Sequence, residues 1–363
     1  MSDAASSVPA DHEPLRRFWR GARGFWRSRD IAVAWGLIGL LVICVMLQVF
    51  VQYRLNLWNR DFFNALEFRD GREIWRQTYL LMALAVPSIG LAVFAVWCRM
   101  TFQRRWRAWL TATLIDAWLG DERYRRLDLW NGEHQNAEYR IAEDARLATD
   151  APIDLVAGLL GSLLSATTFV VVLWHVGGAL SVELSGLTFS IPGYLVVAAV
   201  LYAALTTGTM MLVGRHMVDV IECKNQAESE LKYAFARLRG GAAAQMNSSD
   251  IEATTATVGI AHKDVIRQRR RLCGQHMRTT IVSHGNPLLA PLVGLILCVP
   301  HYVQGTMLLG EVTQAAAAFV AVQGAFNWLV DNYPRLAEWL SSANRVGTLL
   351  DAFDRLEAAE GPG

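Results

Sequence analysis

The sequence predicts an all-α polytopic membrane protein with six transmembrane helices and long cytosolic helical extensions. Three observations lead to this fold class. Hydrophobic residues make up 53% of the 363 residues, and charged residues only 18%. Several apolar runs reach the length of about 20 residues that a helix needs to cross a bilayer. The charged residues are concentrated in two long segments that separate these runs.

Six apolar runs are expected to form the membrane spans. The first four are plain, whereas the fifth is short and contains three prolines, and the sixth is the least hydrophobic. An Ala- and Gln-rich span is tolerated where it faces protein or a water-filled cavity instead of lipid. The predicted spans are 31–53, 78–100, 153–176, 191–213, 286–303 and 311–333.

The distribution of basic residues predicts the orientation. All but five of the 34 Lys and Arg residues fall on one side of the predicted spans, which places both termini in the cytoplasm of a multi-pass inner (plasma) membrane protein. The basic N-terminal segment 1–30 contains "RRFWRGARGFWRSRD" (16–30), which indicates a retention signal and an interfacial anchor. Nucleic-acid binding is the alternative, and the membrane context disfavours it. The five cysteines lack CxxC spacing, so neither a disulfide framework nor a metal site is expected.

The connections between spans differ in length on the two sides. The outer ones are short, about 54–77, 177–190 and 304–310, whereas the inner ones run over about 101–152 and 214–285. The inner segments show amphipathic helical spacing, so they are expected to form two helical hairpins in the cytosol. About thirty extra helical residues would project roughly 45 Å. The six-helix domain is therefore expected to cover 31–346, followed by a cytosolic tail at 347–363.

The stretch "NGEHQNAEYRIAEDAR" (131–146) lies at the far end of the first hairpin and contains no hydrophobic run. We expect a short helix here with charges on every side. Such a helix is either simply solvated or a docking surface for another protein. The residue pattern by itself leaves these two readings equal.

Three motifs carry a resemblance to a known family. They are "LNLWNRDFFNALEFRD" (55–70) after the first span, "NAEYRIAED" (136–144) in the first hairpin, and "VDNYPRLAEWLSSANRV" (330–346) after the sixth span. Together they resemble the family that joins the SbmA/BacA-like peptide transporters to the acyl and vitamin B12/bleomycin ABC transporters. In the second motif, Ala137, Glu138 and Tyr139 depart from the Pro, Asp and Gln of the family pattern.

The resemblance implies the membrane (permease) half of an ABC exporter-fold transporter. In such transporters, helices at the tips of the cytosolic hairpins fit into clefts on the ATPase domains. Carried over to this sequence, the residues expected to couple to an ATPase are Asn136, Glu138, Arg140, Glu143, Asp144, Asn247, Asp250 and Glu252. The second tip, "GGAAAQMNSSD" (240–250), has small and amide residues where an acidic helix is usual.

No ATPase motif is found in the sequence. A phosphate-binding loop needs G-x-x-x-x-G-K-[ST], and the three lysines, Lys224, Lys232 and Lys263, follow Cys, Leu and His. We therefore expect no enzymatic activity and no cofactor in this chain, with ATP and Mg bound only by a partner ATPase. The alternative is proton-driven peptide uptake of the SbmA/BacA type, for which deep carboxylates or histidines would be needed. Asp150, Asp154 and His284, near inner span ends, are weak candidates.

The function predicted from these observations is transport of peptides or other amphipathic or hydrophilic solutes. Two copies, or one copy and a homologous half, would form a twelve-helix pathway, with a regulatory or scaffold membrane protein as a further alternative. Polar residues of the fourth and sixth spans would either line the substrate cavity or form hydrogen bonds between helices. These residues are Thr206, Thr209, Gln314, Gln323, Asn327 and Trp328.

Overall fold

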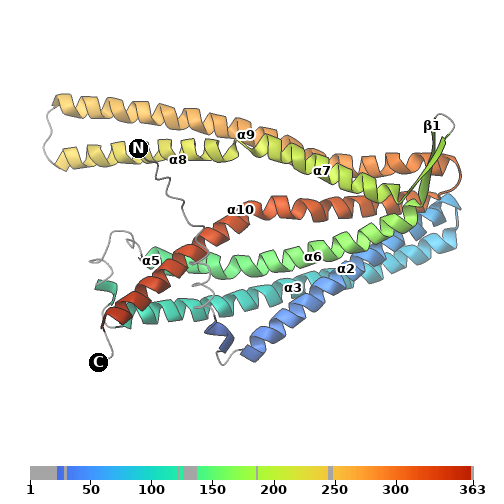
Figure 1. Cartoon of the computed structure of the whole chain (residues 1–363), viewed down its shortest axis with the longest axis horizontal. Coiled ribbons are helices and arrows are strands. Elements are labelled where there is room, and N and C mark those ends of the chain that lie inside the picture. The colour runs from blue at the N-terminus through green and yellow to red at the C-terminus, as the bar shows by residue number, and fades with distance from the viewer. Residues whose placement is uncertain are drawn as a thin grey trace, which may run out of the picture. The chain divides into compact units, whose positions relative to one another are not determined.

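Long helices make up nearly all of the computed structural model (Figure 1). The structure describes residues 23–27, 31–120, 123–125, 137–184, 187–243 and 248–360. The elements are η1 (Phe25–Arg27), α2 (Ile31–Glu67), α3 (Gly71–Leu119), α5 (Ala137–Tyr139), η4 (Arg140–Asp144), α6 (Ala145–Gly177), β1 (Ala179–Leu184), β2 (Leu187–Pro192), α7 (Tyr194–Gly214), α8 (Met217–Ala243), α9 (Ser248–Val303) and α10 (Leu309–Glu360). The all-helical prediction is thus confirmed except for one pair of strands.

The first outer connection is much shorter than predicted. Instead of a loop over 54–77, α2 continues to Glu67 and α3 begins at Gly71. The turn reverses at Arg69, which has a left-handed φ of 55°. Asp70 then caps α3, because its carboxylate accepts hydrogen bonds from the backbone N–H groups of Arg72 and Glu73. The sequence "NLWNRDFFNALE" contains no helix breaker, and so the helix persists to this capped turn.

The second outer connection contains the strand pair. β1 and β2 are antiparallel, with Ala179 opposite Pro192 and Leu184 opposite Leu187. The sequence predicted only a short connection over 177–190 in an all-α chain, so these strands correct that fold class. The sequences "ALSVEL" and "LTFSIP" alternate apolar and polar residues, which is the period of a strand and not of a helix. Gly178 and Gly193, both with positive φ, flank the pair.

Five helical segments are long and apolar enough to cross a membrane. They are Ile31–Glu67, Gly71–Leu119, Ala137–Gly177, Tyr194–Gly240 and Glu252–Val303. Together with the family evidence below, they indicate a multi-pass membrane protein. α10, which contains the predicted sixth span 311–333, is not among these segments, so the count of six is not confirmed.

The helices belong to two compact units, and α10 contributes to both. Unit 1 comprises residues 1–172, 304–314 and 324–363 as far as they are described, and unit 2 comprises 173–303 and 315–323. In unit 1, the hairpin α2–α3 packs along much of its length. In unit 2, α8 and α9 run side by side, as Figure 1 shows, and α7 packs against α9.

The core of unit 1 lies at the end of α3 that is distant from the α2–α3 turn; we call this the cluster end. α3 buries Phe102, Trp106, Leu110 and Leu114 at steps of four residues, which places them on one helical face. Residues of η1, α2, α5, η4, α6 and α10 complete the cluster. They are Phe25, Ala34, Leu37, Ala137, Ile141, Ala145, Ala148, Ala343, Val346, Leu349, Ala352, Phe353 and Leu356.

The ring of Phe25 lies in the same cluster, 6.2 Å from the ring of Trp106 and stacked on it. Phe25, in the described part of the N-terminal aromatic segment, is therefore held by contacts with the protein core, close to the start of the first span. In unit 2, the Ala-rich middle of α10 is buried between helices. Gly294 of α9 leaves room for the backbone of Ala316, and Phe319 packs against Tyr202 of α7. This close packing explains why the segment has few bulky apolar residues.

Candidate functional site

The proposed docking segment is the beginning of a long helix and not a separate tip helix. α5, η4 and α6 continue without interruption from Ala137 to Gly177. The turn Arg140–Asp144 is a π-helix, since the backbone N–H of Ala145 donates to the carbonyl oxygen of Arg140, five residues earlier. Such π turns within α-helices are frequent at functional sites. Asn136 lies outside the described residues.

One face of this segment is buried, so the prediction of charges on every side was wrong. Ala137, Ile141 and Ala145 belong to the hydrophobic cluster of unit 1. These three residues follow at steps of four and form an apolar stripe, which is hard to recognise in the sequence because charged residues lie between them. The segment is therefore amphipathic, with its polar face available for a partner.

Asp144 is on the buried side and is fully engaged within the chain. Its carboxylate accepts two hydrogen bonds from Arg345 of α10, from Nε at 2.8 Å and from an Nη at 2.7 Å. The side chain of Asp144 is 1% exposed, whereas that of Arg345 is 43% exposed. Ser341 and Ser342 also accept hydrogen bonds from the Arg345 guanidinium. The second and third sequence motifs thus meet in a bidentate ion pair, which is geometrically specific.

Two further contacts connect α6 to α10 in unit 1. The indole N–H of Trp339 donates to the carbonyl oxygen of Ala148 at 3.3 Å. The carboxylate of Asp154 pairs with Arg335 of α10 and, at 3.3 Å, with Arg99 of α3. The three contacts follow the two helices in opposite sequence directions, as antiparallel neighbours require. Together the three contacts connect α6 and α10, and we call these two helices the braced pair.

The polar face of the segment presents Glu138, Tyr139, Arg140 and Glu143. Glu138 and Tyr139 are exposed, and Arg140 and Glu143 are half-buried. Arg140 donates to the hydroxyl of Thr348 at 3.3 Å, so its guanidinium is positioned against α10. The hydrogen bond from Arg146 to Glu143 lowers the pKa of the Glu143 carboxyl, which keeps this carboxylate ionised. This face therefore offers fixed charges of both signs.

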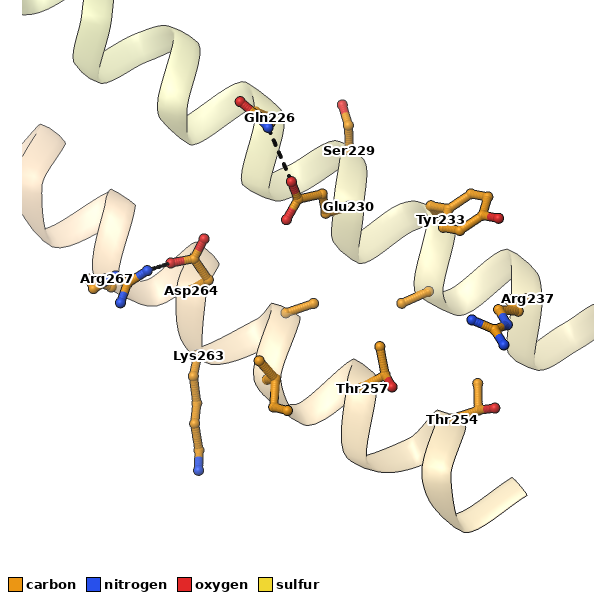
Figure 2. Close-up of a pocket in the computed structure, with 13 residues that line it drawn as sticks. Gln226, Ser229, Glu230, Tyr233, Arg237, Thr254, Thr257, Lys263, Asp264 and Arg267 are labelled. Carbon is orange, nitrogen blue, oxygen red and sulfur yellow. Dashed lines mark hydrogen bonds and ion pairs between the residues drawn. The ribbon is translucent and has the colours of Figure 1, made fainter. Parts of the chain in front are cut away.

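The α8–α9 hairpin of unit 2 contains an open groove of about 890 Å³. Figure 2 shows two interactions in this groove, and each of them joins residues of the same helix. Gln226 donates to Glu230 on α8, and Arg267 pairs with Asp264 on α9. The groove floor includes small residues such as Ala234 and Ala261. An ion pair at 3.1 Å between Arg269 and Glu228 holds the two helices together beside it. Lys224 and Arg269 donate to Glu228 and lower the pKa of its carboxyl.

The second predicted docking tip is only partly described. Asn247 and the side chain of Asp250 lie outside the described part of the structure, whereas Glu252 is exposed near the start of α9. In the described residues, no group of three or more His, Cys, Asp and Glu side chains is arranged to hold a metal ion.

The family is shown by comparison with known proteins. Residues 28–303 match the model of the ABC transporter transmembrane region 2. The chain belongs to this family. It is 26% identical over 89% of its length to the inner membrane ABC transporter ATP-binding protein YddA of Escherichia coli (strain K12), covering 58% of that protein.

Two other relatives extend this result. An uncharacterized ABC transporter ATP-binding protein of Haemophilus influenzae is 24% identical over 88% of the chain, with 54% of that protein covered. The ABC transporter D family member 2, chloroplastic, of Arabidopsis thaliana is 19% identical over 93% of the chain, with 46% covered. The chain thus spans about half the length of the curated relatives it matches.

The predicted cavity residues fall into both units, and only Thr206 and Thr209 lie within the residues that match the family model. In unit 1, Gln314 is buried and donates to the Asn56 side chain at 3.1 Å. In unit 2, Gln323 is buried and donates to the carbonyl oxygen of Ala199 at 2.8 Å. Both glutamines therefore make the hydrogen bonds between helices that were the alternative to lining a cavity.

The other four residues have fewer contacts between helices. The hydroxyls of Thr206 and Thr209 donate to carbonyl oxygens of their own helix, those of Ala203 and Leu205. Trp328 is half-buried and packs so closely on Gly158 of α6 that a methyl group there would lie 2.7 Å from the indole. Asn327 is half-buried.

The first sequence motif joins three helices at the α2–α3 turn, a role that sequence reasoning missed. Asn56 donates to the backbone of Gln314 at 3.1 Å, and Trp58 donates to the backbone of Gln77 at 2.7 Å. Asn64 accepts from the backbone N–H of Gly310 at 2.8 Å, where a side chain would overlap with the α2 backbone. The amides in "NLWNRDFFNALE" were the available signal, because polar groups within a buried helix contact need partners.

Proposed function

We propose that this chain forms the membrane-spanning part of an ABC-type transporter that moves peptides or other amphipathic or hydrophilic solutes across the inner membrane. α10 supplies a sixth span, and both termini are cytoplasmic. Family membership supports a role in membrane transport. The relatives named as ATP-binding proteins, of which the chain covers 58% and 54%, support a link to an ATPase that carries ATP and Mg.

The braced pair α6–α10 carries the proposal. The charged face at Glu138, Arg140 and Glu143 lies at the start of α6, and Asp144 next to it is tied to Arg345 of α10. A movement of the docked ATPase therefore displaces α6 and α10 together. Small displacements of packed helices are amplified at their interfaces into larger conformational changes. Two copies of the chain, or one copy and a homologous half, complete the pathway.

The test is retention of the ATPase on the tagged full-length protein purified from its native host. Arg140→Glu with Glu143→Arg reverses two charges of the docking face, and we expect at least a tenfold loss of retained ATPase and of ATP-driven transport. Arg72→Glu with Arg76→Glu, at the α2–α3 turn, is the matched control and should retain the partner. Unchanged retention in the docking variant contradicts the proposal.

The alternative function is proton-driven uptake without an ATPase. One observation favours it: burial raises the pKa of the Asp150 carboxyl, which lies one helical turn from the ion-paired Asp154. Uptake that an uncoupler abolishes and ATP depletion leaves unchanged would support this alternative. Absence of transport with any co-expressed ATPase would instead favour a regulatory or scaffold role.

A further inference from the structure

One face of α3 is exposed from the α2–α3 turn to the cluster end. Its residues follow at steps of three and four, as one side of a helix requires. None of the residues in the most apolar part of this helix is buried. The exposed apolar members of this α3 stripe are Tyr79, Met82, Val86, Ile89, Val93, Trp97 and Met100.

The chemistry of the α3 stripe changes abruptly after Met100. The next two positions on the same face are Arg104 and Arg107, both exposed, followed by Thr111. A change from apolar to basic residues along one helix face marks the boundary between the hydrocarbon and the headgroup layer. Trp97, one turn before the change, is a residue type enriched at this boundary.

The surface is hollowed at the point of change. Met100, Arg104, Arg107 and Thr111 line a concavity of about 470 Å³, whose other wall includes Asp150 of α6. The backbone positions of Arg104 and Arg107 are nearly one turn apart, about 4.5 Å along the helix axis. The concavity thus combines two positive charges with a hydroxyl donor, and it opens directly onto an apolar helix face.

The two ends of the α3 stripe differ in their electrostatics. At the α2–α3 turn, Arg76 is paired with Glu73 at 2.6 Å, and Asp70 lies close in sequence. At the cluster end, no described residue forms an ion pair with Arg104, and the next acid along α3 is Asp116. Asp150 faces Arg107 across the concavity and offsets part of its charge. A net positive site therefore exists at one end only.

We propose that this concavity binds the headgroup of an anionic phospholipid. Arg104 and Arg107 bind the phosphate, Thr111 donates a hydrogen bond, and the acyl chains lie along Trp97 and Val93. Basic pockets on membrane helices at the headgroup level are suited to such lipids. A lipid fits better than a soluble anion, because a soluble anion would leave the adjacent apolar face uncovered. The site is separate from the proposed docking face and does not depend on how transport is energised.

The test uses the purified full-length chain in detergent, with phosphatidylglycerol, phosphatidylcholine or inorganic phosphate added. Native mass spectrometry counts bound lipids, and thermal unfolding reports stabilisation. We expect phosphatidylglycerol to bind and to raise the unfolding midpoint, while the other two have little effect. Each arginine near a membrane surface contributes about 1 kcal/mol to anionic lipid binding. Arg104→Gln with Arg107→Gln should therefore weaken binding on the order of thirtyfold.

Arg72→Gln with Arg76→Gln, at the other end of the α3 stripe, is the matched control and should bind normally. Arg104→Lys with Arg107→Lys keeps the charges and should retain most of the binding even if the glutamine variant unfolds more easily. The proposal is overturned if the glutamine variant binds as well as the wild type, if the control loses as much, or if inorganic phosphate stabilises equally. Cross-linking of two copies through Met100→Cys in the presence of the lipid would also overturn it, since the face would then be covered by protein.

Discussion

The cluster end of unit 1 and the α8–α9 hairpin of unit 2 were both predicted as long helical extensions, but they are held together differently. At the cluster end, several helical segments bury large side chains, with Trp106 and Leu114 at 1% and 0% exposure. In the α8–α9 hairpin, small residues face an open groove, while Tyr233 is 72% exposed. The difference shows that similar amphipathic sequences form a buried hydrophobic core at the cluster end but leave an open groove in the α8–α9 hairpin.

The ion pairs of the two regions differ in the same way, since one involves a buried carboxylate and the other a partly exposed one. Arg345 and Asp144 connect α10 to a buried carboxylate, whereas Arg269 and Glu228 connect α9 to a carboxylate that is 27% exposed. A buried pair fixes geometry, because removal of one partner leaves a charge in an apolar environment. An exposed pair contributes little and opens easily. The cluster end is thus suited to transmit force, and the hairpin to adapt to a partner.

The largest effect expected from this comparison is that of removing an aromatic side chain. Trp106→Ala should lower the free energy of unfolding by about 3–5 kcal/mol, because a large buried ring is lost from a packed core. Tyr233→Ala, in the groove of the hairpin, is the matched control and should change stability by less than about 0.5 kcal/mol. Both are measured by denaturant unfolding of the purified protein. Equal losses would show that the hairpin is as tightly packed as the cluster end.

A smaller effect is expected from the ion pairs. Arg345→Ala leaves the buried Asp144 without its partner and should cost about 3 kcal/mol, at the low end for buried pairs because Arg345 itself is partly exposed. Adding Asp144→Ala should recover part of this loss, while Arg269→Ala should have a much weaker effect. Unfolding midpoints of the single and double variants check this. No recovery in the double variant would mean that the pair acts only through packing.

The smallest effect concerns pH. The pKa of Glu228 is lowered in the folded state, so its contribution is fully present above the ordinary carboxyl pKa and is lost as the pH falls through the lowered value. The α8–α9 hairpin should therefore open more often at pH 4 than at pH 7, seen as lower protection of α8 amides against hydrogen exchange after correction for the intrinsic rate. Glu228→Gln should remove this difference. A pH dependence that persists in the variant would assign it to another group.

Much of the helical architecture could be predicted from the sequence. Apolar length identified the five helices that are long and apolar enough to cross a membrane, and the amphipathic spacing within 101–152 predicted that α3 continues beyond its apolar run. The strand pair after α6 was not predicted, because the apolar runs identified only the spans that this segment connects. The extension of α2 to Glu67 was not predicted, because the outer connection was expected to begin where the apolar run ends, whereas in the structure Asn56 and Asn64 bind α10.

From the sequence, the candidate site was predicted as a segment, but the roles of its residues were not distinguished. The motif "NAEYRIAED" pointed to this segment, and the resemblance named five of its residues as coupling residues, which stays a prediction. Sequence could not separate Asp144 from Glu143, since both are acids in the same turn. In the structure, Asp144 is paired with Arg345 and only Glu143 lies on the open face.

By itself, the sequence determined the helices, their apolar segments and the family, because hydrophobic length and periodicity are local properties of the chain. The tertiary structure decided which polar residues are internal. Asn56 and Gln314 are 258 positions apart, and Asp144 and Arg345 are 201 apart. Whether such a residue faces water, lipid or a partner depends on which distant helix packs against it, and no local pattern contains that information.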